Sequence, residues 1–148
     1  MATTTVRQAV KRATKVLAAA GVPSPRHDAE VLAAHVLGVS RGGIVRHETL
    51  DVAAFDALVA RRAARVPLQH LTGRAAFRHI EVDVGPGVFV PRPETEVTTG
   101  AAIEVARMLD RPLVVDLYAG SGAIALAVAA EVPDAEVHAV EAEDGAIA

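Results

Sequence analysis

The first 66 residues repeat apolar and polar positions with the spacing of amphipathic helices. Apolar residues that recur every three or four positions share one side of a helix, so this stretch predicts helices that pack their apolar sides together. Thr4 or Thr5 can cap the first helix, and Gly21 can end it. Its predicted inward face consists of Val6, Val10, Ala13, Val16 and Leu17.

Further helices are predicted up to residue 66. Ser24 as N-cap and Pro25 in the first turn begin the second helix, and Gly38 ends it. A short helix follows Ser40, and Asp51 caps the last one. This last helix directs Phe55, Leu58 and Val59 inward and a cluster of arginines outward, namely Arg61, Arg62 and Arg65. We interpret the cluster as a solvated helix face, with contact to an acidic partner as the alternative.

A different period begins at Pro67. Apolar residues then alternate with polar ones at positions 80, 82 and 84, which is typical of a β-strand with one buried side. The turn-forming segment Gly85-Pro86-Gly87 follows, and residues 88–90 are predicted to return as the second strand of a β-hairpin.

The last third of the chain predicts alternating helices and strands. Pro93 opens a helix that runs through Leu109, with glutamates in its first turn, where the helix dipole favours them. The remaining elements are predicted as a buried strand at 113–117, a helix at 123–131 and a strand at 136–140. This order is the start of a parallel α/β sheet. We therefore divide the chain into a helical domain (1–66), a β-hairpin linker (67–92) and an α/β region (93–148).

Composition narrows the possible functions. The 148 residues are 51% hydrophobic, enough for one domain or two small ones. The formal net charge of −3 argues against direct nucleic-acid binding, because no excess of Lys and Arg is available to neutralise phosphates. The absence of cysteine excludes disulfides and thiolate metal sites and fits a cytoplasmic location. The six histidines lack metal-binding spacing, and no apolar run reaches the roughly 18–20 residues of a membrane helix.

The turn at 118–122 has the composition of a ligand-binding corner. In an open parallel sheet, ligands bind beyond the carboxyl ends of the strands, and this turn lies there. Gly120 and Gly122 lack a β-carbon, so a ligand can approach the backbone, and the helix that starts near Ala123 directs free N–H groups toward it. Asp116, at the strand end, can accept hydrogen bonds from the turn or from a cationic group of a ligand.

Glu141 ends the next strand, 19 residues after Gly122. A carboxylate accepts hydrogen bonds in pairs and the two ribose hydroxyls donate in pairs, so this acid and the glycines together predict a site for an adenosine-type ligand. The alternative is a tight turn and a solvated strand end. The segment GSGAIA (120–125) also fits the dinucleotide pattern G-x-G-x-x-A, so the local motif leaves both NAD and S-adenosylmethionine open.

Three stretches of the chain carry a family resemblance. They are PLQHLTGRAAFRHIEVDVGPGVFVPRPETE (67–96), VVDLYAGSGAIALAVA (114–129) and AEVHAVE (135–141). Together they resemble the protein-(glutamine-N5) methyltransferases of peptide chain release factors, the HemK or PrmC family. The resemblance covers nearly the whole chain, and its first stretch is the most specific. It implies a helical bundle domain for substrate recognition, then a β-hairpin and the first part of a Rossmann-like class I methyltransferase domain.

The resemblance also implies an activity in translation termination. Family members transfer a methyl group from S-adenosylmethionine to the glutamine amide of the Gly-Gly-Gln motif in class 1 release factors, which the helical domain helps to hold. By this resemblance Glu141 binds the ribose hydroxyls and Asp116 orders the turn. The methionine and ribose side of the cofactor pocket is implied to be Tyr118, Ala119, Gly120, Ser121 and Gly122. Phe89, Arg92, Pro93 and Thr95 would border the pocket, or else serve as hairpin core and helix cap.

Two features depart from the family pattern. Gly-Thr is usual at the positions of Tyr118 and Ala119. Because tyrosine avoids positive φ, we expect the turn to begin in an ordinary conformation, with the ring covering or narrowing the pocket. The family's catalytic Asn-Pro-Pro-Tyr motif is not in the chain. No catalytic residue is therefore assigned, and the chain is expected to be part of a longer protein and inactive by itself.

Other interpretations stay open at this point. A two-stranded parallel sheet would leave apolar surface through which the chain could self-associate. An NAD-type oxidoreductase domain is one alternative function. A non-catalytic module that docks a release factor through its helical half is another.

Overall fold

The structure is a computed structural model that describes residues 5–143 of the 148. The chain divides into two compact units, residues 1–72 and residues 73–148. Each unit has its own hydrophobic core. Within the described residues, no helix combines the length and apolar character that crossing a bilayer requires.

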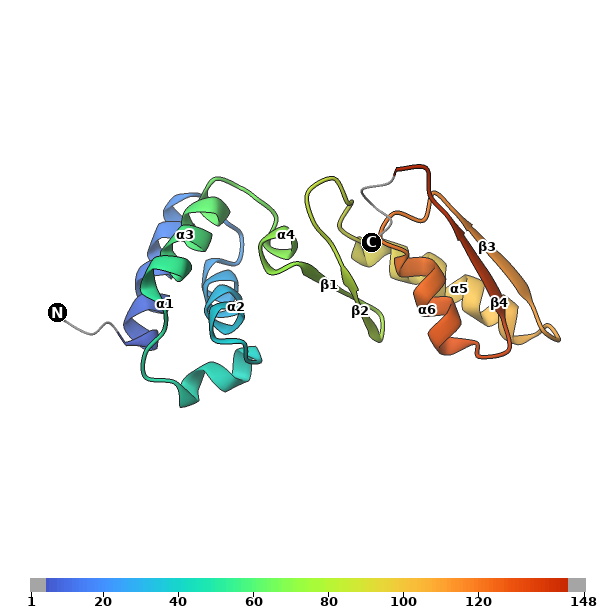
Figure 1. Ribbon diagram of the computed structural model, residues 1–148, viewed down its shortest axis with the longest axis horizontal. Coiled ribbons are helices and arrows are strands. Elements are labelled where there is room, and N and C mark those ends of the chain that lie inside the picture. The colour runs from blue at the N-terminus through green and yellow to red at the C-terminus, as the bar shows by residue number, and fades with distance from the viewer. Residues whose placement is uncertain (1–4, 144–148) are drawn as a thin grey trace. The chain divides into compact units, whose positions relative to one another are not determined.

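The first unit is helical (Figure 1). Its elements are α1 (Val6–Ala19), α2 (Pro25–Leu37), the 3₁₀ helix η1 (Arg41–Arg46), α3 (Val52–Ala63) and α4 (Leu68–Thr72). The core is built from small and branched side chains around one aromatic ring, Phe55, which is fully buried against residues of α1 and α2 such as Leu17 and Leu32. The amphipathic pattern therefore predicted this bundle, but the prediction that Val16 faces inward is wrong, since it is 44% exposed.

Helix boundaries in this unit follow the capping residues. Thr5 caps α1 through a reciprocal pair of hydrogen bonds with Gln8, in which each side chain binds the other residue's backbone N–H. Gly38 ends α2 in the left-handed conformation that glycine adopts freely, and the Asp51 carboxylate accepts from the Ala54 amide at the start of α3. These caps confirm the predicted starts and stops. Thr4, the alternative cap, lies outside the described residues.

One member of the arginine cluster is not solvated. The Arg62 side chain is mostly buried, with 14% of its surface exposed, and its Nε donates to Asp28 Oδ2 of α2 at 2.7 Å. Arg62 Nη1 also donates to the Val66 carbonyl at 3.0 Å. The prediction that Arg62 faces solvent is therefore wrong, because a buried aspartate on the neighbouring helix needs a cation. Arg61 and Arg65 are exposed as predicted.

The second unit begins with a hairpin that lies earlier in the chain than predicted. Strands β1 (Arg74–Phe77) and β2 (Ile80–Asp83) pair antiparallel, with a two-residue turn at Arg78 and His79. Residues 88–90 form no strand, so the predicted return strand there is wrong. The segment RAAF lacks a run of β-branched residues, and Arg78 occupies a positive φ of 51° that glycine or asparagine usually takes, so the pattern gave little sign of this hairpin.

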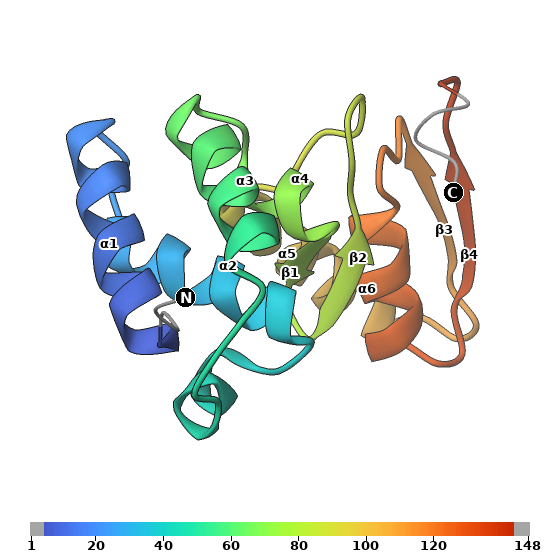
Figure 2. The ribbon, with the colours of Figure 1, turned by 60° about the vertical axis from the view of Figure 1, so that its left-hand side comes forward.

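A parallel strand pair completes the second unit. The elements are α5 (Pro93–Arg107), β3 (Leu113–Leu117), α6 (Ala123–Glu131) and β4 (Glu136–Val140), with β3 and β4 parallel and in direct register. Both helices lie on the same face of this sheet (Figure 2), and Ile103 of α5 and Val128 of α6 are buried against Val114 and Val137. The predicted order of helix, strand, helix and strand is confirmed.

Helix α6 is packed on two sides, which explains why its sequence AIALAVAAE is almost entirely apolar. Ala123 and Ala127 contact the hairpin core around Phe77 and Val82, whereas Val128 faces α5 and the sheet. Small alanines on the hairpin side let the backbone of α6 approach the hairpin closely. The helix that follows the glycine turn is therefore held in place from both sides.

The opposite face of the sheet is uncovered in this unit. Leu113, Val115 and Leu117 of β3 alternate outward and are each more than half exposed. The prediction that residues 113–117 form a buried strand is therefore correct for Val114 and wrong for the outward set. An apolar run does not distinguish a strand that is covered on both faces from one covered on a single face.

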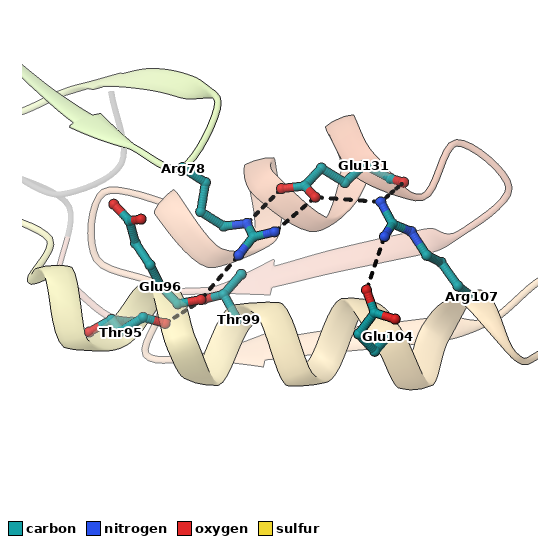
Figure 3. Close-up of polar contacts among 7 residues, drawn as sticks. All are labelled: Arg78, Thr95, Glu96, Thr99, Glu104, Arg107 and Glu131. Atoms are coloured by element: carbon teal, nitrogen blue, oxygen red, sulfur yellow. Dashed lines mark hydrogen bonds and ion pairs between the residues drawn. The ribbon is translucent and has the colours of Figure 1, made fainter.

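An ion-pair network joins the hairpin to the two helices (Figure 3). Arg78 Nε and Nη2 donate to the two Glu131 oxygens at 2.6 and 2.9 Å, and Arg78 Nη1 donates to the Glu96 carbonyl of α5 at 3.2 Å. Arg107 Nη2 lies 3.5 Å from Glu131 Oε2. The mid-helix Gly100 makes room for this guanidinium, since a β-carbon there would lie 3.1 Å from Arg78 Nη1.

Candidate functional site at the glycine turn

The turn after β3 starts with a strained residue. Tyr118 has φ of 62°, in the left-handed region, so the expectation of an ordinary conformation is wrong. The reversal places the Ala119 N–H 3.0 Å from the Val140 carbonyl, which ties the turn to the end of β4. The Tyr118 ring is 87% exposed and does not line the adjacent hollow, so the expected covering of the pocket is not seen in this conformation.

Two glycines continue the turn in left-handed conformations. Gly120 has φ of 56° and Gly122 has φ of 72°, so a side chain at either position would add strain. Nothing lies within 4 Å of a β-carbon built on Gly120, which leaves open space above its backbone. Gly122 is the N-cap of α6 and has no side chain to bind the free amides of the first turn.

Asp116 supplies the missing cap from the end of β3. Its Oδ2 accepts a hydrogen bond from the Ala125 amide at 3.1 Å. Burial raises the pKa of the Asp116 carboxyl above its ordinary value, and the Ala125 hydrogen bond acts in the opposite direction. The carboxylate therefore fixes the start of α6 relative to the strand.

Glu141 lies directly at the glycine turn. Its Oε2 accepts from the Gly120 N–H at 2.7 Å, and its Oε1 accepts from the Ala142 and Glu143 amides at 2.8 and 3.0 Å. These amides, led by that of Glu143, lower the pKa of the Glu141 carboxyl, so it is ionised at neutral pH. A carboxylate has about four acceptor positions, so with three of them occupied it can still accept from a ligand.

A hollow of about 530 Å³ opens between the turn, α6 and the end of β4. The predicted residues Ala119, Gly120, Ser121, Gly122 and Glu141 line it. The rest of the lining is apolar and was not predicted from the sequence: Ala125, Leu126, Ala129, Val137, Ala139 and Val140. The almost entirely apolar sequence of α6, AIALAVAAE, was the available signal, because Leu126 on its free side is half exposed in the structure. A polar rim with an apolar floor suits a ligand that has both hydroxyls and a flat ring.

Of the four predicted border residues, Phe89 and Arg92 precede α5, and Pro93 and Thr95 lie in its first turn. The guanidinium of Arg92 lies 5.1 Å from the ring centre of Phe89, a cation–π contact between two exposed side chains. Pro93 occupies the first turn of α5, and the Thr95 carbonyl accepts from Thr99 Oγ1 at 2.8 Å. None of the four is among the residues that line the hollow.

Comparison with known proteins finds similarity to one group of methyltransferases. Residues 8–73 match the model of the PrmC N-terminal domain. Release factor glutamine methyltransferase from Streptomyces coelicolor is 58% identical over 144 residues, covering 93% of this chain and 50% of that protein. The protein of the same name from Mycolicibacterium smegmatis is 53% identical over 148 residues, covering 97% and 52%. The chain is similar to these release factor glutamine methyltransferases over nearly its whole length.

The chain spans about half the length of these curated methyltransferases. The PrmC N-terminal domain match, 8–73, coincides closely with the compact helical unit of residues 1–72. Identity to the methyltransferases continues beyond that unit, because the aligned 144 and 148 residues include the hairpin and the glycine turn. The α/β half of the chain is therefore also similar to these methyltransferases.

Proposed function

We propose that the protein to which this chain belongs transfers a methyl group from S-adenosylmethionine to the glutamine amide of the Gly-Gly-Gln motif in class 1 peptide chain release factors. The observation that carries the proposal is the 2.7 Å hydrogen bond between the Gly120 amide and Glu141 beside an open hollow. It is supported by the methyltransferase relatives, which are 42–58% identical across most of the chain. Modification of a translation factor implies a cytoplasmic location.

The β3–α6–β4 unit is proposed to be the first part of a Rossmann-like methyltransferase domain. In such sheets the ligand lies beyond the carboxyl ends of the strands, where the glycine turn and Glu141 meet. Glu141 would accept from one ribose hydroxyl at its remaining acceptor position and from the second in place of the Ala142 or Glu143 amide. Ala119 to Gly122 would border the ribose and methionine portions. Asp116 would hold the turn rather than contact the ligand, because its carboxylate already accepts a hydrogen bond from the Ala125 amide. The apolar floor would receive the adenine ring.

The chemistry of the transfer defines what else the protein must supply. S-adenosylmethionine provides an electrophilic methyl group. An amide nitrogen is a poor nucleophile because its lone pair is delocalised into the carbonyl, so much of the rate must come from positioning the amide. The proposal assigns cofactor binding to residues 116–141 and assigns binding of the substrate amide to residues outside this chain. Residues 1–148 alone are therefore predicted to have no useful turnover.

An NAD-type oxidoreductase domain is the second candidate function, because Gly120, Gly122 and Ala125 fit the dinucleotide pattern. Both ligands contain adenosine, so the turn and Glu141 do not separate them. They differ in the second half of the ligand, and direct binding measurements distinguish them. A non-catalytic docking module is the third candidate, and it predicts release-factor binding that does not respond to either ligand.

The direct test is a methylation assay with the full-length protein, S-adenosylmethionine and a class 1 release factor. Mass spectrometry of the Gly-Gly-Gln peptide is expected to show one added methyl group on the glutamine. A release factor with that glutamine replaced by alanine is the matched control and should stay unmodified. Release-factor binding without any methylation, or equal methylation of the alanine variant, would contradict the proposed activity.

A further inference from the structure

Tyr118 has a backbone conformation that the fold does not require of a tyrosine. Its φ of 62° lies in the left-handed region, which is disfavoured for residues that carry a β-carbon and is freely adopted by glycine. The turn itself is held by backbone hydrogen bonds, in which the Ala119 N–H donates to the Val140 carbonyl at 3.0 Å and the Gly122 N–H donates to the Ala119 carbonyl at 2.8 Å. Glycine at position 118 would keep both bonds without strain, so a strained tyrosine here points to a role beyond folding.

The Tyr118 side chain contributes little to the packing of the second unit. It is 87% exposed, the largest exposed fraction among the exposed large hydrophobic side chains of the described residues. Its hydroxyl makes no hydrogen bond to any residue in the range 5–143. Exposed side chains change rotamer within picoseconds to nanoseconds, so this ring is free to move toward a ligand.

Tyr118 directly precedes the residues of the turn that line the hollow. Ala119, the next residue, is the first of them. Consecutive Cα atoms are about 3.8 Å apart, which is less than the reach of a tyrosine side chain. A change in the two side-chain torsions of Tyr118 therefore brings its ring within reach of a molecule bound against Ala119 and Gly120, although the ring does not line the hollow in the present conformation.

The lining of the hollow offers little to a positively charged ligand atom. Among the described residues that line it, Glu141 is the one charged residue and none is aromatic. The Glu141 carboxylate already accepts from three backbone amides, and its remaining capacity is assigned to the ribose in the proposed function. A positive charge beside the ribose would therefore meet mainly apolar and backbone groups in this part of the protein.

S-adenosylmethionine carries such a charge on the sulfur atom between its ribose and its methionine portion. Ala119 to Gly122 are proposed to border both portions, so Tyr118 adjoins the charged sulfur rather than the adenine, which is assigned to the apolar floor. The face of a tyrosine ring attracts a cation that lies within about 6 Å of the ring centre. S-adenosylhomocysteine, the product, has a neutral sulfur and would gain nothing from this attraction.

We propose that the Tyr118 ring covers the sulfonium group of bound S-adenosylmethionine and makes the site prefer this charged methyl donor over the neutral product. The identity of the ligand rests on the proposed function, and the inference adds a residue that distinguishes the methyl donor from its product. The strain at Tyr118 is retained for this selectivity, because glycine would relieve the strain but would offer no ring.

The test measures the affinities of the full-length protein for S-adenosylmethionine and for S-adenosylhomocysteine by calorimetric titration. Tyr118→Leu removes the ring but keeps a side chain at the strained position, and Tyr118→Phe keeps the ring and is the matched control. We expect Tyr118→Leu to weaken S-adenosylmethionine binding about two- to fivefold and to leave S-adenosylhomocysteine binding nearly unchanged, whereas Tyr118→Phe keeps the wild-type ratio of the two affinities. Tyr118→Gly should lose the same selectivity although its strain is relieved, which separates the effect of the ring from that of the backbone.

The outcomes separate this inference from the proposed function. If Tyr118→Leu binds both ligands as the wild-type protein does, or loses affinity for both equally, the ring does not select the methyl donor. Loss of selectivity in Tyr118→Phe would also overturn the inference, because the hydroxyl rather than the ring face would then be responsible. A wild-type protein that binds both ligands and methylates the release factor, with variants that keep its affinity ratio, would contradict this inference alone. A wild-type protein that binds neither ligand would contradict the proposed function as well.

Discussion

Tyr118 holds a backbone conformation in which its β-carbon crowds the following carbonyl group, at φ of 62°. Its ring is almost fully exposed, so replacing it sacrifices little packing. We predict that Tyr118→Gly stabilises the second unit by about 0.5–1 kcal/mol, after the larger backbone entropy of glycine is subtracted. Thermal unfolding should show a melting temperature a few degrees higher. A lower melting temperature would mean that the ring makes a stabilising contact.

Glu141 is the residue on which cofactor binding is predicted to depend most. Glutamine at this position keeps the size of the side chain but removes the charge that the Gly120 and Glu143 amides stabilise. We predict that Glu141→Gln weakens S-adenosylhomocysteine binding by about tenfold or more, because hydrogen bonds to charged acceptors are the stronger ones. Glu136→Gln is the matched control, since Glu136 is exposed at the start of β4, the strand that Glu141 follows, and lies outside the hollow. If the two variants bind S-adenosylhomocysteine with equal affinity, Glu141 is not part of the cofactor site.

At the scale of elements, the ion pair of Arg78 is predicted to make the melting temperature of the second unit fall at acid pH. Its hydrogen bonds hold the pKa of Glu131 below the ordinary value of 4.5. A carboxyl whose pKa is lower in the folded than in the unfolded state stabilises the fold fully when the pH is above its unfolded-state pKa. This stabilisation is lost as the pH falls through the folded-state pKa. The melting temperature should therefore be flat above about pH 5 and fall below about pH 4.

The matched variants for this prediction are Arg78→Gln and Arg74→Gln. Arg78→Gln should lower the melting temperature by several degrees at neutral pH and flatten its decline in acid, because Glu131 loses its bidentate partner. Arg74 is exposed at the other end of β1, 3.5 Å from Glu81, and its replacement should change little. If the melting temperatures of both variants depend on pH as that of the wild-type protein does, the ion-pair network does not determine this pH dependence.

The helices and the strand at 80–83 could be predicted from the sequence, whereas the strand that pairs with it, β1, could not. Thr5, Gly38 and Asp51 act through local backbone chemistry, so their roles are readable from the order of residues alone. The hairpin depends instead on packing of Ala75 and Phe77 against α6, far along the chain. Burial of Arg62 against Asp28 is likewise a contact between two helices that no local pattern reports.

For the site, the sequence predicted the polar residues better than the apolar ones. Gly120 and Glu141 were identifiable because a turn and a strand end fix where they lie. The hollow's floor at Leu126 and Val137 requires knowing how α6 is turned against β4, which depends on the packing of α6 between the hairpin and the sheet. The strain at Tyr118 was missed because the Ala119 amide is bound by a strand distant in sequence.

At the scale of the whole molecule, the uncovered sheet face predicts how residues 1–148 behave alone. Leu113, Val115 and Leu117 form an apolar row on β3. Both faces of parallel sheets are normally covered, so we predict concentration-dependent association of the isolated chain through this row. Multi-angle light scattering should show a rising average mass, which Val115→Lys should reduce and the exposed helix variant Val97→Lys should not. A constant monomer mass in the wild-type chain would exclude this association.

The most direct test of the whole account is calorimetric titration of the full-length protein with S-adenosylhomocysteine and, separately, with NADH. The glycine turn and Glu141 are predicted to bind S-adenosylhomocysteine at one site per chain and to give no saturable heat with NADH. Saturable binding of NADH without binding of S-adenosylhomocysteine would contradict the methyl-donor site and favour the oxidoreductase alternative.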